Sequence, residues 1–192
     1  MFYKNIKIIK KPYKINVLVN KNNKLDKEFI PQNLLKVPKN FSIKECYLQK
    51  KACKAFEKLC KDANKANYRI KAASCYRSYD YQEKIYNEYI KELGQEYTEM
   101  ASARPGFSEH QTGLAVDVEG SKDTYDEFEK TKEFKWMLKN AYKYGFILRY
   151  PKGKKNITGF KYEPWHYRYI GKRRAKKIYK KRITLEEYLK RR

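Results

Sequence analysis

The chain has 192 residues, which is enough for one domain with a hydrophobic core and too few for two domains of ordinary size. Hydrophobic residues make up 41% and aromatic residues 16% of the chain, so an intrinsically disordered protein is excluded even though 35% of the residues are charged. No run of about 18 apolar residues occurs, and we therefore expect no transmembrane segment.

Lysine and arginine number 46 against 22 acidic residues, which gives a net charge of +24. A small soluble domain usually carries a net charge of about 2 to 8 in magnitude, so this excess favours an anionic environment. Nucleic acid and the phosphate-rich polymers of a bacterial envelope both provide one. Charge alone does not separate these two from a merely solubilising surface.

Residues 1–20 interleave lysine with isoleucine and valine. They contain neither an unbroken apolar segment of about seven residues nor a small-residue cleavage site, so they do not resemble a secretory signal. We expect a cytoplasmic protein, a protein released to the cell wall by lysis, or a secreted protein whose leader has been removed.

The first 40 residues are predicted to form a strand and an extended arm that packs on residues 41–192, within a single domain. Residues 13–19 are apolar and β-branched and precede an asparagine-rich turn, which predicts the strand. Pro31 and Pro38 then favour extended chain.

Residues 42–45 (SIKE) have the pattern of a helix capping box, and apolar residues at helical spacing follow, so we predict a helix over residues 42–66. The cysteines of this helix recur every seven residues, at Cys46, Cys53 and Cys60. Successive sulfurs would lie about 10.5 Å apart along the axis, which is too far for a disulfide. The spacing also differs from that of a CxxC zinc chelate. We expect small buried hydrophobic residues in a reduced compartment.

The remaining chain alternates short strands and helices. Strands are predicted at residues 68–76, 114–118, 146–150 and 162–170, with a polar loop at 101–113 and a second loop at 151–160. Helices are predicted at 79–93, at 131–144 and in two basic segments at the end of the chain, the second opened by the capping box 184–187 (TLEE). This order argues against a parallel βαβ array and predicts an α+β fold with a small antiparallel sheet and helices packed around it.

Only two histidines occur, His110 and His166, and each has a carboxylate nearby: Asp117 follows the first and Glu163 precedes the second. Two imidazoles and one carboxylate suit catalytic zinc, and a second carboxylate free of the metal would be the general base. Spacing does not decide which acid has which role. Because no HExxH pattern occurs, the histidines could also be hydrogen-bonded core side chains.

Three longer strings carry more information. Residues 108–117 (SEHQTGLAVD) match the pattern SxHxxGxAxD, residues 163–167 (EPWHY) match a second motif, and residues 76–82 (YRSYDYQ) resemble a YRSxxxQ segment. Together, in this order, they resemble the D-alanyl-D-alanine carboxypeptidases of the VanY type, which are zinc peptidases. The resemblance covers residues 17–189, nearly the whole chain.

The resemblance implies a Zn²⁺ cofactor bound by His110, Asp117 and His166 on the antiparallel sheet, with Glu163 as the catalytic base. It makes Arg77 an arginine that contacts the substrate. Because a guanidinium can bind either the terminal carboxylate of the substrate or the oxygen on which charge develops, Arg77 suits both tasks. Further residues expected in the substrate cleft are Gln82, Ser108 and Trp165. It also makes residues 41–192 the zinc peptidase catalytic domain.

The implied function is removal of the terminal D-Ala from peptidoglycan stem peptides by zinc-activated water, as a D,D- or L,D-carboxypeptidase. A phage-type endolysin that cuts an internal peptidoglycan bond would use the same chemistry. A thiol mechanism through Cys75 is not expected, because the metal takes both histidines.

A basic nucleic-acid-binding protein is the alternative from another class. The basic residues are spread along the whole chain and match no nucleic-acid motif, so no specific nucleic acid is expected. We expect a monomer whose basic surface suits anionic wall polymers.

Overall fold

The computed structural model describes residues 2–120 and 125–190, so the outermost bounds of the predicted division, residues 1 and 192, lie outside it. Its strands are β1 (Lys7–Ile8), β2 (Asn23–Lys24), β3 (Leu34–Lys36), β4 (Tyr47–Gln49), β5 (Lys71–Ser74), β6 (Ala115–Glu119), β7 (Phe146–Leu148) and β8 (His166–Tyr169). Its α-helices are α1 (Lys50–Lys65), α2 (Tyr79–Leu93), α3 (Gln95–Ala101), α4 (Lys132–Asn140), α5 (Lys155–Thr158), α6 (Lys172–Lys181) and α7 (Leu185–Lys190). The 3₁₀ segments are η1 (Lys39–Phe41), η2 (Glu109–Thr112), η3 (Tyr125–Lys130) and η4 (Ala141–Tyr144).

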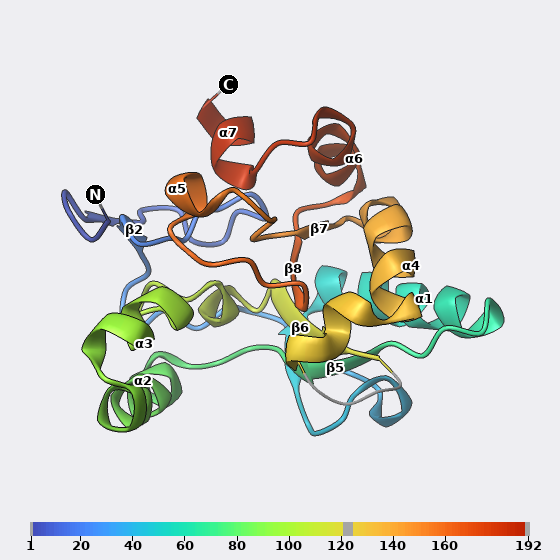
Figure 1. Cartoon of the computed structure of the whole chain (residues 1–192), viewed down its shortest axis with the longest axis horizontal. Coiled ribbons are helices and arrows are strands. Elements are labelled where there is room, and N and C mark those ends of the chain that lie inside the picture. The colour runs from blue at the N-terminus through green and yellow to red at the C-terminus, as the bar shows by residue number, and fades with distance from the viewer. Residues whose placement is uncertain (1, 121–124, 191–192) are drawn as a thin grey trace.

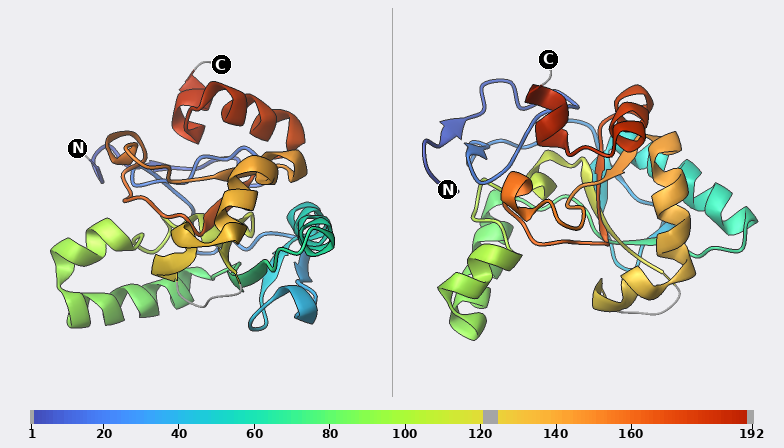
Figure 2. Two further views of the ribbon diagram at one scale, coloured as in Figure 1. Left: turned by 45° about the vertical axis from the view of Figure 1, so that its right-hand side comes forward. Right: turned by 45° about the horizontal axis from the view of Figure 1, so that its top comes forward.

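A four-stranded antiparallel sheet in the order β5-β6-β8-β7 forms the centre of the molecule. Figures 1 and 2 show α1 and α4 on one side of this sheet and the α2–α3 pair on the other, while α7 lies near the N-terminal segment. Two small pairs lie outside the sheet, β1-β2 parallel and β3-β4 antiparallel. The predicted α+β fold with a small antiparallel sheet is therefore confirmed.

The main hydrophobic core lies between the sheet and α1 and α4. The buried side chains of α1 recur at helical spacing: Ala52, Cys53, Phe56, Leu59, Cys60 and Ala63. Val116 and Val118 of β6 belong to the same core. Because successive side chains of a strand point to opposite faces, Asp117 lies on the other face of the sheet. No helix in the described ranges is long and apolar enough to cross a membrane.

Residues 13–19 do not form the predicted strand. The backbone carbonyls of Ile15 and Val17 instead accept hydrogen bonds from Arg168 Nη2, at 3.0 and 2.9 Å. A guanidinium from β8 thus satisfies groups that a strand partner would have paired. The apolar residues of this region form a small separate cluster, Val17, Val19, Leu25 and Phe29.

The predicted start of the long helix was wrong, because α1 begins at Lys50 and not at the capping-box sequence. Residues 42–49 are largely extended: Ile43 N donates to Ala72 O at 2.9 Å, and β4 pairs with β3. Tertiary pairing here overrides a local helix signal. Cys46 consequently lies outside α1, although all four cysteines are buried.

Most of the other predicted elements are confirmed. α2 spans the predicted residues 79–93, and the helix predicted at 131–144 is α4 continued by η4. The C-terminal capping box forms, since Thr184 N donates to Glu187 Oε2 at 2.8 Å and Glu187 N to Thr184 Oγ1 at 3.2 Å. The strand predicted at 162–170 is shorter, because a turn precedes β8. The helical segments η2, α3 and α5 were not predicted.

The central packing of Phe56 gives a first prediction. Its side chain is fully buried and meets Phe146 edge to face, with ring centroids 6.1 Å apart. Phe56→Ala should lower the free energy of unfolding by about 3–5 kcal/mol, measured by urea denaturation. Ile30→Ala is the control, because Ile30 is 66% exposed and should change it by less than about 0.5 kcal/mol. Equal effects in both variants would contradict this description of the core.

Candidate active site

Strand register brings Asp117 and His166 together. β6 and β8 are antiparallel, and Asp117 lies directly opposite His166, while β5 places Ser74 on the other flank of Asp117. Directly opposed residues of an antiparallel pair have Cβ atoms about 4.5–5.5 Å apart. The acid in the middle strand can therefore reach an imidazole on its neighbour.

His110 reaches the same point from the 3₁₀ turn η2. Ser108 Oγ accepts a hydrogen bond from His110 N at 3.3 Å and so caps this turn. The turn ends at Gly113, whose φ of 64° is left-handed and whose amide donates to His110 O at 3.1 Å. A Cβ at Gly113 would approach Leu34 Cδ2 to 2.9 Å, so both conformation and space favour glycine there.

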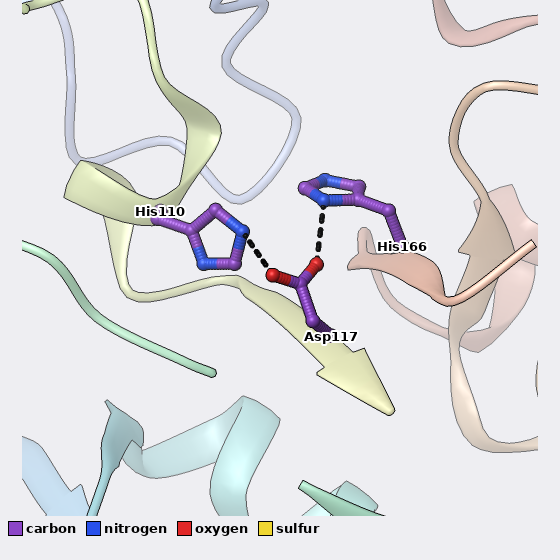
Figure 3. A group of neighbouring side chains, drawn as sticks. All are labelled: His110, Asp117 and His166. Carbon is purple, nitrogen blue, oxygen red and sulfur yellow. Dashed lines mark hydrogen bonds and ion pairs between the residues drawn. The ribbon is translucent and has the colours of Figure 1, made fainter. Parts of the chain in front are cut away.

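Asp117 lies between the two imidazoles, as Figure 3 shows. Its Oδ1 is 2.9 Å from His166 Nδ1, and its Oδ2 is 3.1 Å from His110 Nε2. One potential ligand atom from each of the three residues lies within 4.8 Å of the others, and all three side chains are buried. His110 Nε2 makes no hydrogen bond of acceptable geometry. A buried donor set with such an unsatisfied nitrogen fits a metal ion.

The outer nitrogens of both imidazoles face groups that can orient them. His110 Nδ1 contacts Cys75 O at 2.5 Å, and His166 Nε2 lies 3.6 Å from Glu109 Oε2. Metal-binding histidines usually donate their second N–H to a carbonyl or carboxylate, which fixes ring orientation and tautomer. This arrangement leaves His110 Nε2 and His166 Nδ1 as the inward nitrogens.

The surroundings of the two histidines shift their pKa values in opposite directions. Burial, reinforced by Arg77, lowers the pKa of His110 to about 4, so its imidazole is neutral and able to bind a metal. Burial opposes the charged form of His166 as well, but Asp117 and Glu109 together raise its pKa to about 9, so His166 Nδ1 must release its proton when a metal binds there. The two histidines hold the pKa of Asp117 well below its usual range despite its burial. The site thus has an ionised carboxylate at its centre.

Glu163 and Arg77 lie beside the three clustered side chains. Glu163 Oε2 is 3.8 Å from His166 Nδ1, and burial raises the pKa of Glu163 to about 7. Arg77 Nη2 is 3.8 Å from Asp117 Oδ2, and Arg77 Nη1 donates to Gln82 Oε1 at 3.0 Å. Arg77 Nε is buried without a hydrogen-bond partner among the described residues.

A cleft of about 560 Å³ opens over these groups. Every residue that the sequence placed in the site lines it: Arg77, Gln82, Ser108, His110, Asp117, Glu163, Trp165 and His166. Gln82 is fully engaged at its amide nitrogen, which donates to Ala103 O at 2.8 Å and to Ser102 Oγ at 3.3 Å. Its side chain therefore supports Arg77 from within the protein.

Comparison with known proteins agrees with this geometry. A family model for the VanY D-alanyl-D-alanine carboxypeptidases matches residues 45–172. The chain belongs to the VanY family. It is thus a carboxypeptidase-type hydrolase, and the resemblance inferred from the three motifs is confirmed.

Relatives of this VanY-family chain include the putative carboxypeptidase YodJ of Bacillus subtilis (strain 168), which is 42% identical over 190 residues, or 95% of this chain and 70% of the relative. The solved structure of the LdcB LD-carboxypeptidase is similar with a TM-score of 0.90 and 41% identity, over 97% of this chain and 91% of that one. A Zn(II) complex of a variant of the vancomycin resistance D,D-pentapeptidase VanY aligns with a TM-score of 0.78 and 33% identity, over 91% and 98% of the two chains.

The VanY-family chain also has a buried ionic network behind His166, which the sequence analysis missed. Glu109 Oε1 accepts from Arg149 Nε and from Arg168 Nη1, both at 2.8 Å, and Arg149 also binds Glu186 at 2.7 and 2.9 Å. Both guanidinium groups are fully buried. The available signal was a single arginine in each of two mainly aromatic and aliphatic segments, residues 146–150 and 166–170, neither of which contains another lysine, arginine or acidic residue.

The network gives a second prediction. Glu109→Gln removes the negative charge shared by two buried arginines and should lower the free energy of unfolding by about 3–5 kcal/mol. Urea denaturation in the presence of a chelator measures this without a contribution from metal. Glu129→Gln is the matched control, because the side chain of Glu129 is 43% exposed and lies 3.7 Å from Lys152. This substitution should change the free energy of unfolding by at most about 1 kcal/mol. A similarly small change for Glu109→Gln would contradict the network.

Proposed function

We propose that this VanY-family chain is a zinc-dependent carboxypeptidase that removes the C-terminal D-Ala from peptidoglycan stem peptides. The observation that carries the proposal is the convergence of His110, Asp117 and His166 in a buried cluster beside Glu163. We assign His110 Nε2, an Asp117 oxygen and His166 Nδ1 as zinc ligands. The Zn(II) complex of the VanY relative and the oriented outer nitrogens of both histidines support this assignment.

Zinc bound by this set supplies a Lewis acid and lowers the pKa of water. Glu163 is assigned as the general base, because its carboxylate is buried next to the ligand set and its pKa is raised to about 7. Such a group accepts a proton from the attacking water and returns it to the departing amine. The water attacks directly, so no covalent enzyme intermediate is needed.

Arg77 is assigned to substrate binding and charge stabilisation. The bond to be cut precedes a terminal carboxylate, and a guanidinium binds carboxylates with strong, directional hydrogen bonds. Arg77 Nε is buried at the cleft without a partner among the described residues, while Gln82 holds Nη1. Gln82 therefore acts by positioning Arg77, and Ser108 and Trp165 form further parts of the cleft wall.

For the bond cut, we propose the L,D bond of a tetrapeptide stem. The similarity to the LdcB LD-carboxypeptidase extends over nearly the whole of both chains and supports this choice. The D,D bond of a pentapeptide and the internal bond cut by an endopeptidase remain the two other outcomes of the assay, because all three reactions use the same groups.

The first test of the proposal is an assay of purified protein with tetrapeptide and pentapeptide stems, followed by mass analysis of the products. We expect loss of one D-Ala from the tetrapeptide, its abolition by a chelator, and its recovery with Zn²⁺. Cleavage of the pentapeptide alone would reassign the enzyme to the D,D class. Failure of the zinc-loaded protein to cleave either peptide would overturn the carboxypeptidase proposal.

Two variants distinguish metal binding from proton transfer. His166→Ala should lose zinc on dialysis, measured by elemental analysis, because a ligand is gone. Glu163→Gln should retain zinc and lose turnover by about 10²–10⁴-fold, because the base is gone. Glu129→Gln, an exposed acid-to-amide change, should keep both properties. Turnover at the wild-type rate in Glu163→Gln would refute its assignment as the base.

A further inference from the structure

Two thiols meet at the catalytic cleft. Cys46 Sγ and Cys75 Sγ lie 2.9 Å apart, although the residues are separated by 29 positions in the sequence. Both side chains are buried, and both residues are among those that line the cleft. The other two cysteines, Cys53 and Cys60, lie on α1 and are not among the lining residues.

The backbone around the pair has the geometry of paired strands. Tyr76 N donates to Tyr47 O at 2.9 Å, and Ile43 N donates to Ala72 O at 2.9 Å, so residues 43–47 and 72–76 run side by side. Neighbouring strands lie about 4.7–4.9 Å apart, which falls inside the range of about 4.4–6.8 Å between Cα atoms that a disulfide spans. The two sulfurs can therefore reach bonding distance with little movement of the backbone.

We propose that Cys46 and Cys75 are a disulfide-forming pair that is oxidised by a low-molecular-weight disulfide entering the cleft. The Cys46 thiolate attacks one sulfur of that disulfide, forming a mixed disulfide and releasing one thiol. The Cys75 thiolate then attacks the Cys46 sulfur, forms the Cys46–Cys75 bond and releases the second thiol. The small disulfide takes up both electrons, and the two protons lost by the cysteines end on the released thiols.

The hydrogen bond between the two thiols gives the pair an order of reaction. It lowers the pKa of Cys46, which favours Cys46 as the attacking sulfur. Cys46 is also the more accessible of the two, with 6% of its surface exposed against 2% for Cys75.

The bridge would strengthen the support of the active site. Cys75 O contacts His110 Nδ1, and Arg77 follows Cys75 by two residues. The disulfide would therefore link the backbone segment that contains Cys75 and Arg77 to the residue directly before β4. It would also close a loop that contains all of α1. Closing a loop of this size restricts the unfolded chain, and we expect Tm to rise by roughly 5–10 °C.

The test uses the full chain, treated with oxidised glutathione or with dithiothreitol. Remaining thiols are alkylated after denaturation, and the protein is mapped by peptide mass analysis. Oxidation should yield a linked peptide pair that contains Cys46 and Cys75, with Cys53 and Cys60 alkylated, and dithiothreitol should reverse the linkage and the rise in Tm. Four alkylated cysteines, a bridge to Cys53, or a persistent mixed disulfide would each overturn the proposal.

Two variants provide matched controls. Cys53→Ala should still form the bridge, whereas Cys46→Ala should form none and show no rise in Tm on oxidation. A linked Cys75 in Cys46→Ala, or loss of the bridge in Cys53→Ala, would contradict the proposed pair. If Cys46→Ala does not fold, the peptide map of the unsubstituted chain decides the question alone.

Discussion

The placement of Asp117 between two imidazoles constrains the arrangement of the strands and the turn around it. Its carboxylate contacts His110 on one side and His166 on the other while being buried. This requires β6 in the interior of the sheet, β8 in a register that sets His166 opposite Asp117, and a tight turn that returns His110 to the start of the same strand. A slip of one residue in β6 would turn the carboxylate into the apolar core beside α1.

The second requirement is that the charges around this site be neutralised inside the protein. A buried charged group is tolerated only when it has partners of opposite charge. Here Glu109 accepts hydrogen bonds from both Arg149 and Arg168, and Arg149 also donates to Glu186. Because the members come from η2, the residue after β7, β8 and α7, the network joins elements far apart in the chain. Arg168 extends it to the N-terminal segment through the carbonyls of Ile15 and Val17. The remaining oxygen of Glu109 faces His166, so the same network borders the proposed zinc site.

Local sequence signals succeeded where neighbouring residues decide the structure. α2 occupies the predicted residues 79–93, and the capping box at 184–187 forms its reciprocal hydrogen bonds. The same capping pattern at residues 42–45 failed, because Ser42 and Ile43 pair with Ala72 of β5 and the residues that follow form β4, which pairs with β3. The seven-residue spacing of Cys46, Cys53 and Cys60 suggested one continuous helix that carries all three. It gave no indication that Cys46 lies next to Cys75.

The sequence by itself determined the fold class, through the order of its predicted strands and helices, and the family, through three motifs in a fixed order. It also named eight of the residues that line the cleft. It named His110, Asp117, Glu163 and His166 without their geometry. Only the tertiary structure decided which imidazole nitrogens face Asp117 and which charges lie behind His166. The physical reason is separation along the chain: Asp117 and His166 are 49 residues apart, and the register that joins them is set by packing and hydrogen bonds between strands.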